Sequence, residues 1–543
     1  MKQNLEHSTD IAKRIVRGVR GFNLCAYLVA LEGWRRGLTL KWYYNTPSNA
    51  ELKAIGFNPI GKMFSLSSDE RTHFFFRSRG DKVHNEAVDM GTNKEQTKKY
   101  LEKEGVPCPE GKRFKEEVAD EEIIQYARKL GYPLVIKPTF GSLGKGVVTN
   151  INTDEGFKKN LRYVRSTLNY LDVIIERFIS GEDARVYVVQ DKVVAALKRV
   201  PANVTGDGKS TIEELIQKKN EERKKNPHLA TRLIKVDEEV HTFLRKEGYS
   251  LSSVLKKEEL IYLRGKSNIS SGGDSIDITD QLPAEIKEVA VKAVSSVPGL
   301  VHAGVDLIIK GNKAVVMEIN PTAVIASHLF PMTGIPRNVP KAIVDYYFPE
   351  TKETIKNNFY FDYKVINNLM SSREVNEIEI TNAPIGQIHT KRYIVTGKVQ
   401  GVGYRRWVRK RALLHNIHGY TKNLDNGKVV IVAASSNKSD LDEFLKSCYI
   451  GPDKANVARI KEYEWYNPIK VGFEIRSKSK EEEIKELKLE LNQIKREKQE
   501  MEQEMSYIVK KYSDMKGKYE AIRNSSSWKV TAPLRKLMSL IKN

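Results

Sequence analysis

The chain has 543 residues, and its 91 Lys and Arg residues outnumber its 69 Asp and Glu residues, which gives a formal net charge of +22. The length allows roughly three or four domains, and the charge favours an anionic partner: a nucleotide, a polyanion, nucleic acid or a membrane surface. Three widely separated cysteines exclude a disulfide framework and a cysteine-rich zinc site. No apolar run approaches the roughly 20 residues of a membrane-spanning helix, and the N-terminus MKQNLEHSTD lacks a secretory signal pattern, so we expect a cytoplasmic protein.

The first two thirds of the chain divide into three parts by composition. Residues 1–90 combine a helical pattern with two β-rich runs and are interpreted as a small α/β region. In residues 91–350, helical and strand patterns alternate with Gly and Pro between them. Residues 351–387 are polar and lack a clear period, so we interpret them as a connector.

The last third begins with a compact unit at residues 388–478. Its pattern is β-α-β-β-α-β, with a tight-turn signal at Asp425-Asn426-Gly427, which is the element order of a ferredoxin-like split fold. The sequence therefore predicts an α+β multidomain chain.

Residues 479–524 follow with apolar residues in alternating steps of three and four, which predicts a coiled coil and self-association; a lone charged helix is the alternative. The single polar residue of this stripe, Lys498, favours a defined register and a low oligomer number. Residues 525–543 form a basic, amphipathic tail. The stripe consists of Ile484, Leu487, Leu491, Ile494, Lys498, Met501, Met505, Ile508, Tyr512, Met515, Tyr519 and Ile522.

Three clusters in residues 91–350 carry chemistry. In the first, Lys137 ends an apolar strand beside a Gly-rich loop, where ammonium and backbone N–H groups can meet phosphate oxygens; a plain hairpin with solvated lysines is the alternative. In the second, an apolar strand runs into Glu176 and offers hydrogen-bond acceptors to adenine. In the third, Asp306, Glu318 and Asn320 share one phase of two strands joined by a turn, a set of oxygen donors that suits Mg²⁺.

These clusters, in this order, resemble the ATP-grasp ligases, and most closely the ATP-grasp regions of cyanophycin synthetase and bifunctional glutathione synthetases. The resemblance covers about 260 residues and rests on three motifs: KRVPANVTGDGKSTIEELI (198–216), YLRGKSNISSGGDSIDITD (262–280) and EINPTAVIASHLFPMTGIPRNV (318–339). It implies an ATP-grasp fold that uses ATP and two Mg²⁺ ions. A carboxylate would be activated as an acyl phosphate, and an amine would then displace phosphate.

The resemblance also implies roles for individual residues. The ATP phosphates would be bound by Lys94, Lys137 and a closing loop that includes Gly141, Ser142, Gly144, Lys145 and Gly146. The adenosine would be bound by Glu176, Phe178, Ile179, Glu182 and Asp183. The two Mg²⁺ ions would be held by Asp306, Glu318 and Asn320, and the reacting groups would be faced by Arg199, Arg264, Ser271 and Gly272.

One short segment departs from the family pattern. Where the family usually has a Pro-Gly-Phe-Arg-like run, this chain has Ala323-Val324-Ile325-Ala326. A Gly there would let backbone N–H groups approach an anionic substrate, and an Arg would pair with a carboxylate. We therefore expect a substrate other than the amino acid of the better-known relatives, with an inactive site as the alternative.

The compact unit at 388–478 resembles acylphosphatase over nearly its whole length. The motif GKVQGVGYRRWV (397–408) places an anion-binding cradle at a strand–helix junction, and GYTKN (419–423) follows it. The resemblance implies that Arg405 binds phosphate and that Asn423 orients the attacking water. A module that only binds anions is the alternative.

Together the motifs predict an ATP-dependent carboxylate–amine ligase with an attached acyl-phosphate hydrolase. The acylphosphatase-like unit would hydrolyse acyl phosphate that the ligase has formed but not used, or it would act on the acyl phosphate of another enzyme. The rival interpretation is a non-catalytic nucleotide-binding scaffold assembled by its coiled coil. The tail resembles a short segment of bacterial cell-surface glycosyltransferases, so contact with a membrane surface or a polysaccharide-making enzyme stays open. Nucleic acid ranks low because no known binding module is present.

Overall fold

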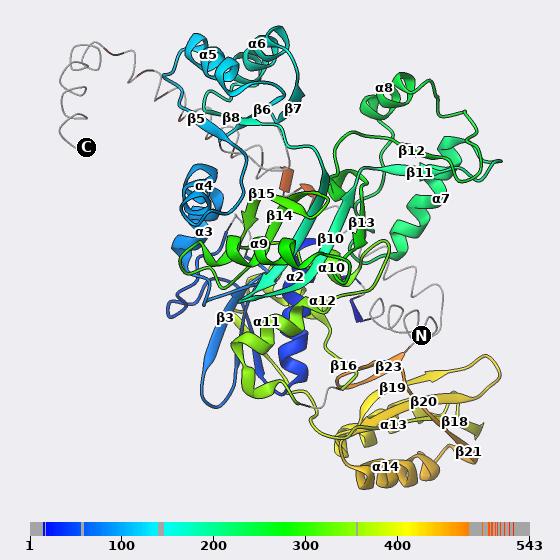
Figure 1. Ribbon diagram of the computed structural model, residues 1–543. Helices are drawn as coiled ribbons and strands as arrows, with labels where there is room; N and C mark the ends of the chain where they lie inside the picture. Colours follow the sequence, from blue (N-terminus) through cyan, green and yellow to red (C-terminus); the bar gives the residue numbers. More distant parts are fainter. Residues whose placement is uncertain are drawn as a thin grey trace.

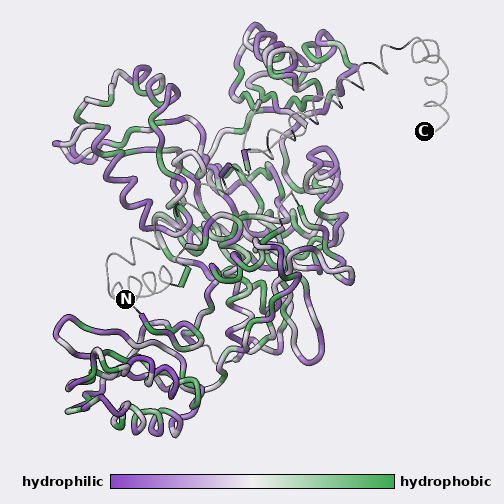
Figure 2. The backbone as a smooth tube through the Cα atoms, turned by 180° about the vertical axis from the view of Figure 1, so that it is seen from behind, coloured by the Kyte–Doolittle hydropathy of each residue, from purple (hydrophilic) through white to green (hydrophobic). Residues whose placement is uncertain are grey.

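The computed structural model describes residues 15–16, 18–55, 59–139, 146–354 and 357–476, together with isolated positions between 491 and 525. Figure 1 shows a central body from which two lobes extend at one end, while the C-terminal unit lies at the other end. Apolar stretches gather in the central body, whereas hydrophilic stretches dominate the outer lobes (Figure 2). Among the described residues, no helix has the length and apolar character to cross a membrane.

The N-terminal unit packs one buried helix against an antiparallel sheet. Helix α2 (Gly21–Arg35) is apolar on all sides, and every residue from Leu24 to Trp34 is buried, as expected for a helix without a solvent-facing side. The sheet has the strand order β17-β1-β2-β3-β4. Its members are β1 (Thr39–Tyr43), β2 (Met63–Ser67), β3 (Thr72–Phe76), β4 (Arg79–Gly80) and β17 (Glu377–Ile380).

The range interpreted as a connector contains regular structure that its polar composition concealed. It carries β16 (Phe359–Tyr360), α12 (Tyr363–Ser372) and β17, and β17 completes the N-terminal sheet by pairing antiparallel with β1. Side chains of both parts support this return of the chain: the Trp34 indole N–H donates to the Thr381 carbonyl at 2.8 Å, and the Tyr363 hydroxyl to the Gly61 carbonyl at 2.6 Å. These residues therefore belong to the N-terminal unit.

Two helices lead from the N-terminal unit into a small lobe. Helix α3 (Asn85–Thr92) is followed by α4 (Lys94–Lys103), whose first backbone N–H groups are capped by the Asn93 side chain. The lobe is a four-stranded sheet covered by two helices. Its elements are β5 (Gly111–Phe114), α5 (Asp120–Leu130), β6 (Leu134–Pro138), β7 (Val148–Ile151), α6 (Asp154–Arg162) and β8 (Val173–Arg177), and the strand order is β5-β8-β6-β7.

The central body contains a five-stranded antiparallel sheet with the order β13-β10-β9-β14-β15. Along β9, Val186 and Val188 pack with α9, while Tyr187 and Val189 pack with α2 and α11 on the opposite face. The sheet is thus covered on both faces. Its elements are β9 (Glu182–Val189), β10 (Lys192–Val200), β13 (Asp274–Asp277), α9 (Ala284–Ser295), β14 (His302–Lys310), β15 (Lys313–Asn320), α10 (Ala326–Leu329) and α11 (Val339–Tyr347).

An insert between β10 and β13 forms the second lobe, with a small core of its own. Its long helix begins with a capping box between Thr211 and Glu214. The insert consists of β11 (Asn203–Thr205), α7 (Ile212–Lys225), α8 (Glu238–Lys246) and β12 (Leu260–Tyr262).

The C-terminal unit has the expected β-α-β-β-α-β order, followed by a fifth strand. The strand order is β21-β18-β20-β19-β23, and the two helices pack on one another. A short strand, β22 (Ile469–Lys470), pairs in parallel with β16 and thereby joins this unit to the connector. The other elements are β18 (His389–Lys398), α13 (Tyr404–Leu414), β19 (His418–Asn423), β20 (Val429–Ser435), α14 (Lys438–Ile450), β21 (Asn456–Glu464) and β23 (Phe473–Arg476).

The predicted coiled coil lies mostly outside the described residues. The isolated positions that are described in this stretch are helical, and the stripe residues Leu491, Met501, Met505 and Met515 are each more than half exposed. Pairing with a second helix therefore stays a prediction. The basic tail from residue 526 onward lies outside the described residues.

Candidate active sites

A cleft between the small lobe and the central body gathers the lysines expected to bind phosphate. Two neighbouring pockets share Lys94, Lys98 and Glu176 in their linings. The second pocket also reaches Lys137 and Glu318, so that the lobe strands β6 and β8 face β15 of the central sheet across it. Helix α4 supplies Lys94 and Lys98, which lie one turn apart.

Glu176 is the buried centre of this cleft. Its carboxylate forms an ion pair with the ammonium of Lys137 at 2.5 Å and lies 3.9 Å from the ammonium of Lys98. The Lys98 ammonium also donates to the Gly111 carbonyl at 2.9 Å. Burial lowers the pKa of Lys94, although the nearby Glu318 opposes this effect. The pocket that reaches Glu318 is therefore lined by three lysines and two carboxylates, which leaves an excess of positive charge that suits an added anion.

A second polar group lies on the face of the central sheet that is turned toward the N-terminal unit. Asp306 is directly opposite Arg185 on one side and Glu318 on the other. Arg185 donates two hydrogen bonds to Asp306 along one guanidinium edge, from Nε at 2.7 Å and from Nη2 at 2.8 Å, and Arg199 bridges Asp306 at 3.1 Å and Asp183 at 2.7 Å. Burial acts to raise the pKa of Asp306, but the two arginines outweigh it and hold that pKa below its ordinary value.

The oxygen donors in this group are compatible with Mg²⁺. Asp306, Glu318 and Asn320 lie on one face of two paired strands. Asp306 pairs with Glu318, and Gly304, two positions before Asp306, pairs with Asn320, so both pairs point to the same face. Glu318 is exposed to the cleft, whereas Asp306 has most of its lone pairs occupied by the two arginines. The described residues contain no cluster of three His, Cys, Asp or Glu side chains placed to hold a metal, so an amide oxygen and ligand oxygens would have to complete the shell.

Of the predicted nucleotide residues that the structure describes, only Lys94, Lys137 and Glu176 line the two pockets, and the others lie outside those linings. The backbone N–H of Phe178 donates to the Pro133 carbonyl at 2.9 Å, and Ile179 is half-buried beside it. Glu182 is exposed and forms an ion pair with Lys198. Gly146 has a φ of +70°, and a Cβ there would meet Pro138 at 2.8 Å. The remaining predicted loop residues, Gly141, Ser142, Gly144 and Lys145, lie outside the described residues.

Arg264 is not brought together with Arg199. Its buried guanidinium pairs with Glu239 and, at 2.5 Å, with Asp237, and it donates to the Lys235 carbonyl at 3.0 Å, so its described partners belong to the insert. The structure thus gives this predicted catalytic arginine a part in holding α8 to the loop before Gly265.

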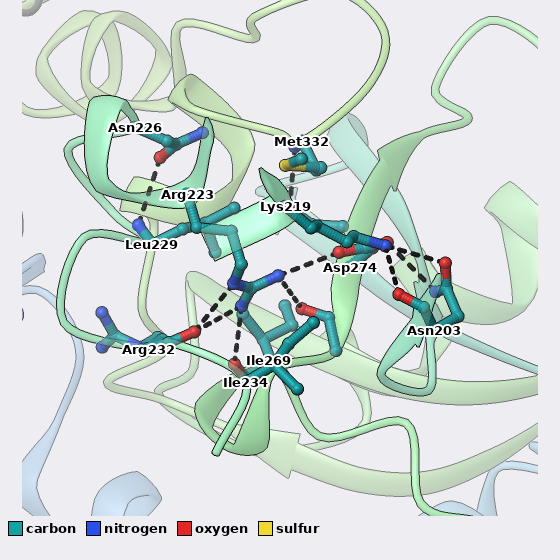
Figure 3. Close-up of polar contacts among 12 residues, drawn as sticks. Asn203, Lys219, Arg223, Asn226, Leu229, Arg232, Ile234, Ile269, Asp274 and Met332 are labelled. Atoms are coloured by element: carbon teal, nitrogen blue, oxygen red, sulfur yellow. Dashed lines mark hydrogen bonds and ion pairs between the residues drawn. The ribbon is translucent and has the colours of Figure 1, made fainter. Parts of the chain in front are cut away.

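Ser271 and Gly272 lie on a loop that is held by a buried network (Figure 3). The guanidinium of Arg223, which is wholly buried, donates to the Gly273 carbonyl at 3.1 Å and to the Asp274 carboxylate at 2.9 Å. Lys219 binds the other oxygen of Asp274 at 2.6 Å. The network therefore anchors the end of this loop to α7.

The segment that departs from the family pattern packs into the apolar core. Ala323, Ile325 and Ala326 are buried against α2 and the N-terminal sheet, and the Ser78 hydroxyl donates to the Ala323 carbonyl at 2.9 Å. This segment therefore supplies packing and no side-chain charge.

The second predicted site lies at one end of the C-terminal sheet. Gly403, with a φ of +81°, caps helix α13, and Arg405 in its first turn donates to the Arg476 carbonyl at 3.5 Å. Arg476 is the strand partner of Lys422, the neighbour of Asn423, so Arg405 and Asn423 reach the same end of the sheet. The side-chain oxygen of Asn423 is buried and accepts no hydrogen bond from the described residues.

Gln400 stabilises the cradle of this second site. Its side-chain amide donates to the Leu424 carbonyl at 2.9 Å and to the Lys428 carbonyl at 2.8 Å, which fixes the turn after β19 beside the loop before α13. A Cβ added at Gly401 or at Gly403 would meet no atom within 4 Å, so the space over this loop is open to a ligand.

Two residues of the first site escaped the sequence analysis. Lys98 was detectable because it follows Lys94 by one helical turn. Arg185 shares the strand phase of Asp183, but its partner Asp306 is 121 positions away, and only the pairing of β9 with β14 brings the two together.

Comparison with known families identifies the domain that contains each candidate site. Residues 92–323 match the ATP-grasp domain, and residues 391–475 match acylphosphatase. Cyanophycin synthetase from Geminocystis herdmanii is 35% identical over 275 residues, covering 48% of this chain and 31% of that protein. The glutathione biosynthesis bifunctional protein GshAB from Desulfotalea psychrophila is 34% identical over 264 residues, covering 47% and 33%.

Among solved structures, a bifunctional glutathione synthetase from Pasteurella multocida is similar at 28% identity and a TM-score of 0.44, covering 53% of this chain and 41% of that one. An acylphosphatase from Coxiella burnetii shares 30% identity with a TM-score of 0.16, covering 16% of this chain and 93% of that one. The chain spans about a third of the length of the curated relatives that it matches. It carries an ATP-grasp domain followed by an acylphosphatase domain.

Proposed function

We propose that the chain is an ATP-dependent carboxylate–amine ligase that works through an acyl phosphate. The observation that carries this proposal is the cleft in which Lys94, Lys137 and Glu176 face Glu318. In it the lysines would bind the ATP phosphates, and Glu176, Phe178 and Ile179 would line the adenine pocket, with Glu182 or Asp183 near the ribose.

The chemistry requires charge to be neutralised where it develops. Asp306, Glu318 and Asn320 would hold Mg²⁺, which polarises phosphate oxygens when it is bound. The lysines would compensate the growing charge on the transferred phosphate, and Arg199 would stabilise the acyl group during attack by the amine. Arg199 is poised for this because its two carboxylate partners fix its orientation.

The ligase proposal is tested by ADP release from the full chain with a panel of carboxylates and amines. Release that requires both substrates is expected, and Glu318→Gln should lower it by about a hundredfold or more, because a preorganised electrostatic group is lost. Glu288→Gln, on the outer surface of α9, is the matched control. Unchanged ADP release in Glu318→Gln would refute the assignment of this cleft.

We also propose that the C-terminal unit hydrolyses acyl phosphates. Arg405 would bind the phosphate together with the backbone N–H groups of residues 401–404, and Asn423 would orient water for attack on the acyl phosphate. The unpaired, buried oxygen of Asn423 supports this role, because such an atom is costly unless a ligand or water completes it.

Benzoyl phosphate is the substrate for the second test. The full chain should release phosphate from it, and Arg405→Met should reduce the rate by at least a hundredfold, while Arg409→Met on the exposed side of the same helix should not. Equal rates for both variants would exclude hydrolysis at this site.

A further inference from the structure

A cavity of about 450 Å³ lies where the connector meets the C-terminal unit. Its described lining comes from three short stretches of the chain, within residues 357–359, 386–390 and 465–469. The first two belong to the connector and the start of β18, and the third follows β21 and ends in β22. Figure 1 shows β16 of the connector at the border of the C-terminal unit.

Strand β18 places this cavity at the opposite end of the C-terminal sheet from the proposed hydrolytic site. Thr390, near the start of the strand, lines the cavity, whereas Lys398, at its end, leads into the cradle loop before α13. At roughly 3.3 Å per residue, the two positions lie about 25 Å apart. None of the residues assigned to the two proposed active sites is among the described lining residues, so the cavity is a separate site.

Contacts between the connector and the C-terminal unit hold the walls of the cavity together. Phe359 and Ile469 are buried and are partners in the pairing of β16 with β22. The Ile469 N–H donates to the Asn358 carbonyl at 3.2 Å, and the Thr390 hydroxyl donates to the Trp465 carbonyl at 2.5 Å. The cavity is therefore preformed by the fold.

Two neighbouring aromatic residues line the cavity. Trp465 is half-buried, and its ring meets the ring of Tyr420 edge-on at 6.4 Å. Its indole N–H is buried and has no hydrogen-bond partner among the described residues, which favours a ligand oxygen or a water beside the ring. Tyr466 is 72% exposed, so its ring has a large apolar area that a ligand would cover.

Every polar side chain in the part of the lining that the structure describes is uncharged. The side-chain amides of Asn358, Gln387 and Asn467 form no hydrogen bonds with other described residues. Each amide therefore offers both an acceptor and donors to a ligand. A charged ligand would lose hydration here without gaining an opposite charge, which is unfavourable. The lining thus favours a neutral molecule with many hydroxyl groups.

We propose that this cavity binds a neutral saccharide of one or two rings. The C–H faces of a sugar ring pack on aromatic side chains, and each sugar hydroxyl both donates and accepts, as the amides do. The cavity volume lies in the range of small-molecule sites. This inference does not rest on either proposed activity. A bound saccharide would contact the connector and the C-terminal unit at once.

Saturation-transfer NMR on the full chain tests the cavity with glucose, galactose, N-acetylglucosamine and cellobiose. At least one of them should bind with a dissociation constant in the millimolar range. Sorbitol, which lacks a ring, and glucuronate, which carries a charge, should bind more weakly. Tyr466→Ala should weaken binding of that saccharide about tenfold because the ring is lost, and Gln387→Leu about fivefold because a hydrogen-bonding group is lost. Both side chains are exposed, so the melting temperature without saccharide should not change.

Three control variants separate a binding role from a general effect of substitution. Tyr466→Phe keeps the ring and should bind as the wild type does. Tyr449→Ala and Gln125→Leu, which remove an exposed tyrosine and an exposed glutamine outside the cavity lining, should also leave binding unchanged.

The proposal is overturned if none of the four saccharides binds more tightly than sorbitol, or if Tyr466→Ala and Gln387→Leu bind the saccharide as the wild type does. Tighter binding of glucuronate than of every neutral sugar would contradict a neutral ligand. Uridine is the last probe, because a nucleobase also stacks on aromatic rings and bonds to amides. Uridine that binds more tightly than every saccharide, and only while Tyr466 is present, would overturn the saccharide assignment in favour of a nucleobase.

Discussion

His328 is a buried side chain without any hydrogen-bond partner among the described residues. It lies on α10, in the segment after Ala326, and neither ring nitrogen is satisfied. Burial lowers its pKa to about 3, and the charge of Arg185 acts in the same direction. In the unfolded chain its pKa is about 6.5. Below pH 6.5 the unfolded chain therefore takes up a proton that the folded chain excludes, and stability falls as the pH decreases toward 3.

We expect His328→Leu to make the protein less sensitive to acid. The leucine removes two unsatisfied polar atoms at neutral pH and also removes the protonation of this side chain in the unfolded state. With a pKa of about 3 in the folded chain and about 6.5 in the unfolded chain, that protonation lowers the free energy of unfolding by about 2 kcal/mol at pH 5. The loss of melting temperature between pH 7 and pH 5 should shrink in the variant. His241→Leu, at an exposed position, is the control, and an identical loss in wild type and His328→Leu would contradict the argument.

At the scale of elements, local sequence patterns predicted the strand pairings that residues close together in the sequence determine. The hairpin turn at Gly311-Asn312 fixes how β14 pairs with β15 as far as Leu307 and Val316, so the pairing of the two strands could be predicted from sequence. A bulge between Asp306 and Leu307 then shifts the register and brings Glu318 opposite Asp306, which the turn alone does not determine. Strand β17 could not be predicted, because its four residues gain their stability only by pairing with β1, more than 300 positions earlier. The same reason hid the contact between Arg185 and Asp306.

The predicted coiled coil is the element whose partner would be a second copy of the chain. Of its described apolar stripe residues, Leu491, Met501, Met505 and Met515 are exposed and Ile508 is half-buried, and a second helix with the same repeat would bury them. We expect the full chain to sediment as a dimer or small oligomer, and Met501→Glu with Met505→Glu to shift it to the monomer. Gln499→Glu, which adds charge away from the stripe, should leave the association state unchanged. A wild-type chain that sediments as a monomer would refute self-association through this helix.

For the whole molecule, the two domains pose a question of coupling, since one would form an acyl phosphate and the other would destroy it. The pairing of β16 with β22 joins the C-terminal unit to the connector, and the connector in turn completes the N-terminal sheet through β17. The C-terminal unit is therefore attached to the body that carries the proposed ligase cleft, and released intermediate would meet the proposed hydrolytic site on the same chain.

This arrangement predicts the fate of ATP when the amine is absent. The ligase would convert the carboxylate and ATP into acyl phosphate and ADP; water at the C-terminal site would then yield carboxylate and phosphate, which permits another cycle. ADP release without amine should therefore continue at a steady rate in the wild-type chain. In Arg405→Met the released acyl phosphate should accumulate, where hydroxylamine traps it as the hydroxamate, and phosphate release without amine should fall well behind ADP release, while amine-dependent ADP release should remain. Arg409→Met should behave as wild type. Equal amine-independent phosphate release in wild type and Arg405→Met would show that the C-terminal unit acts on acyl phosphates from elsewhere, because the intermediate would then be lost to water without its help.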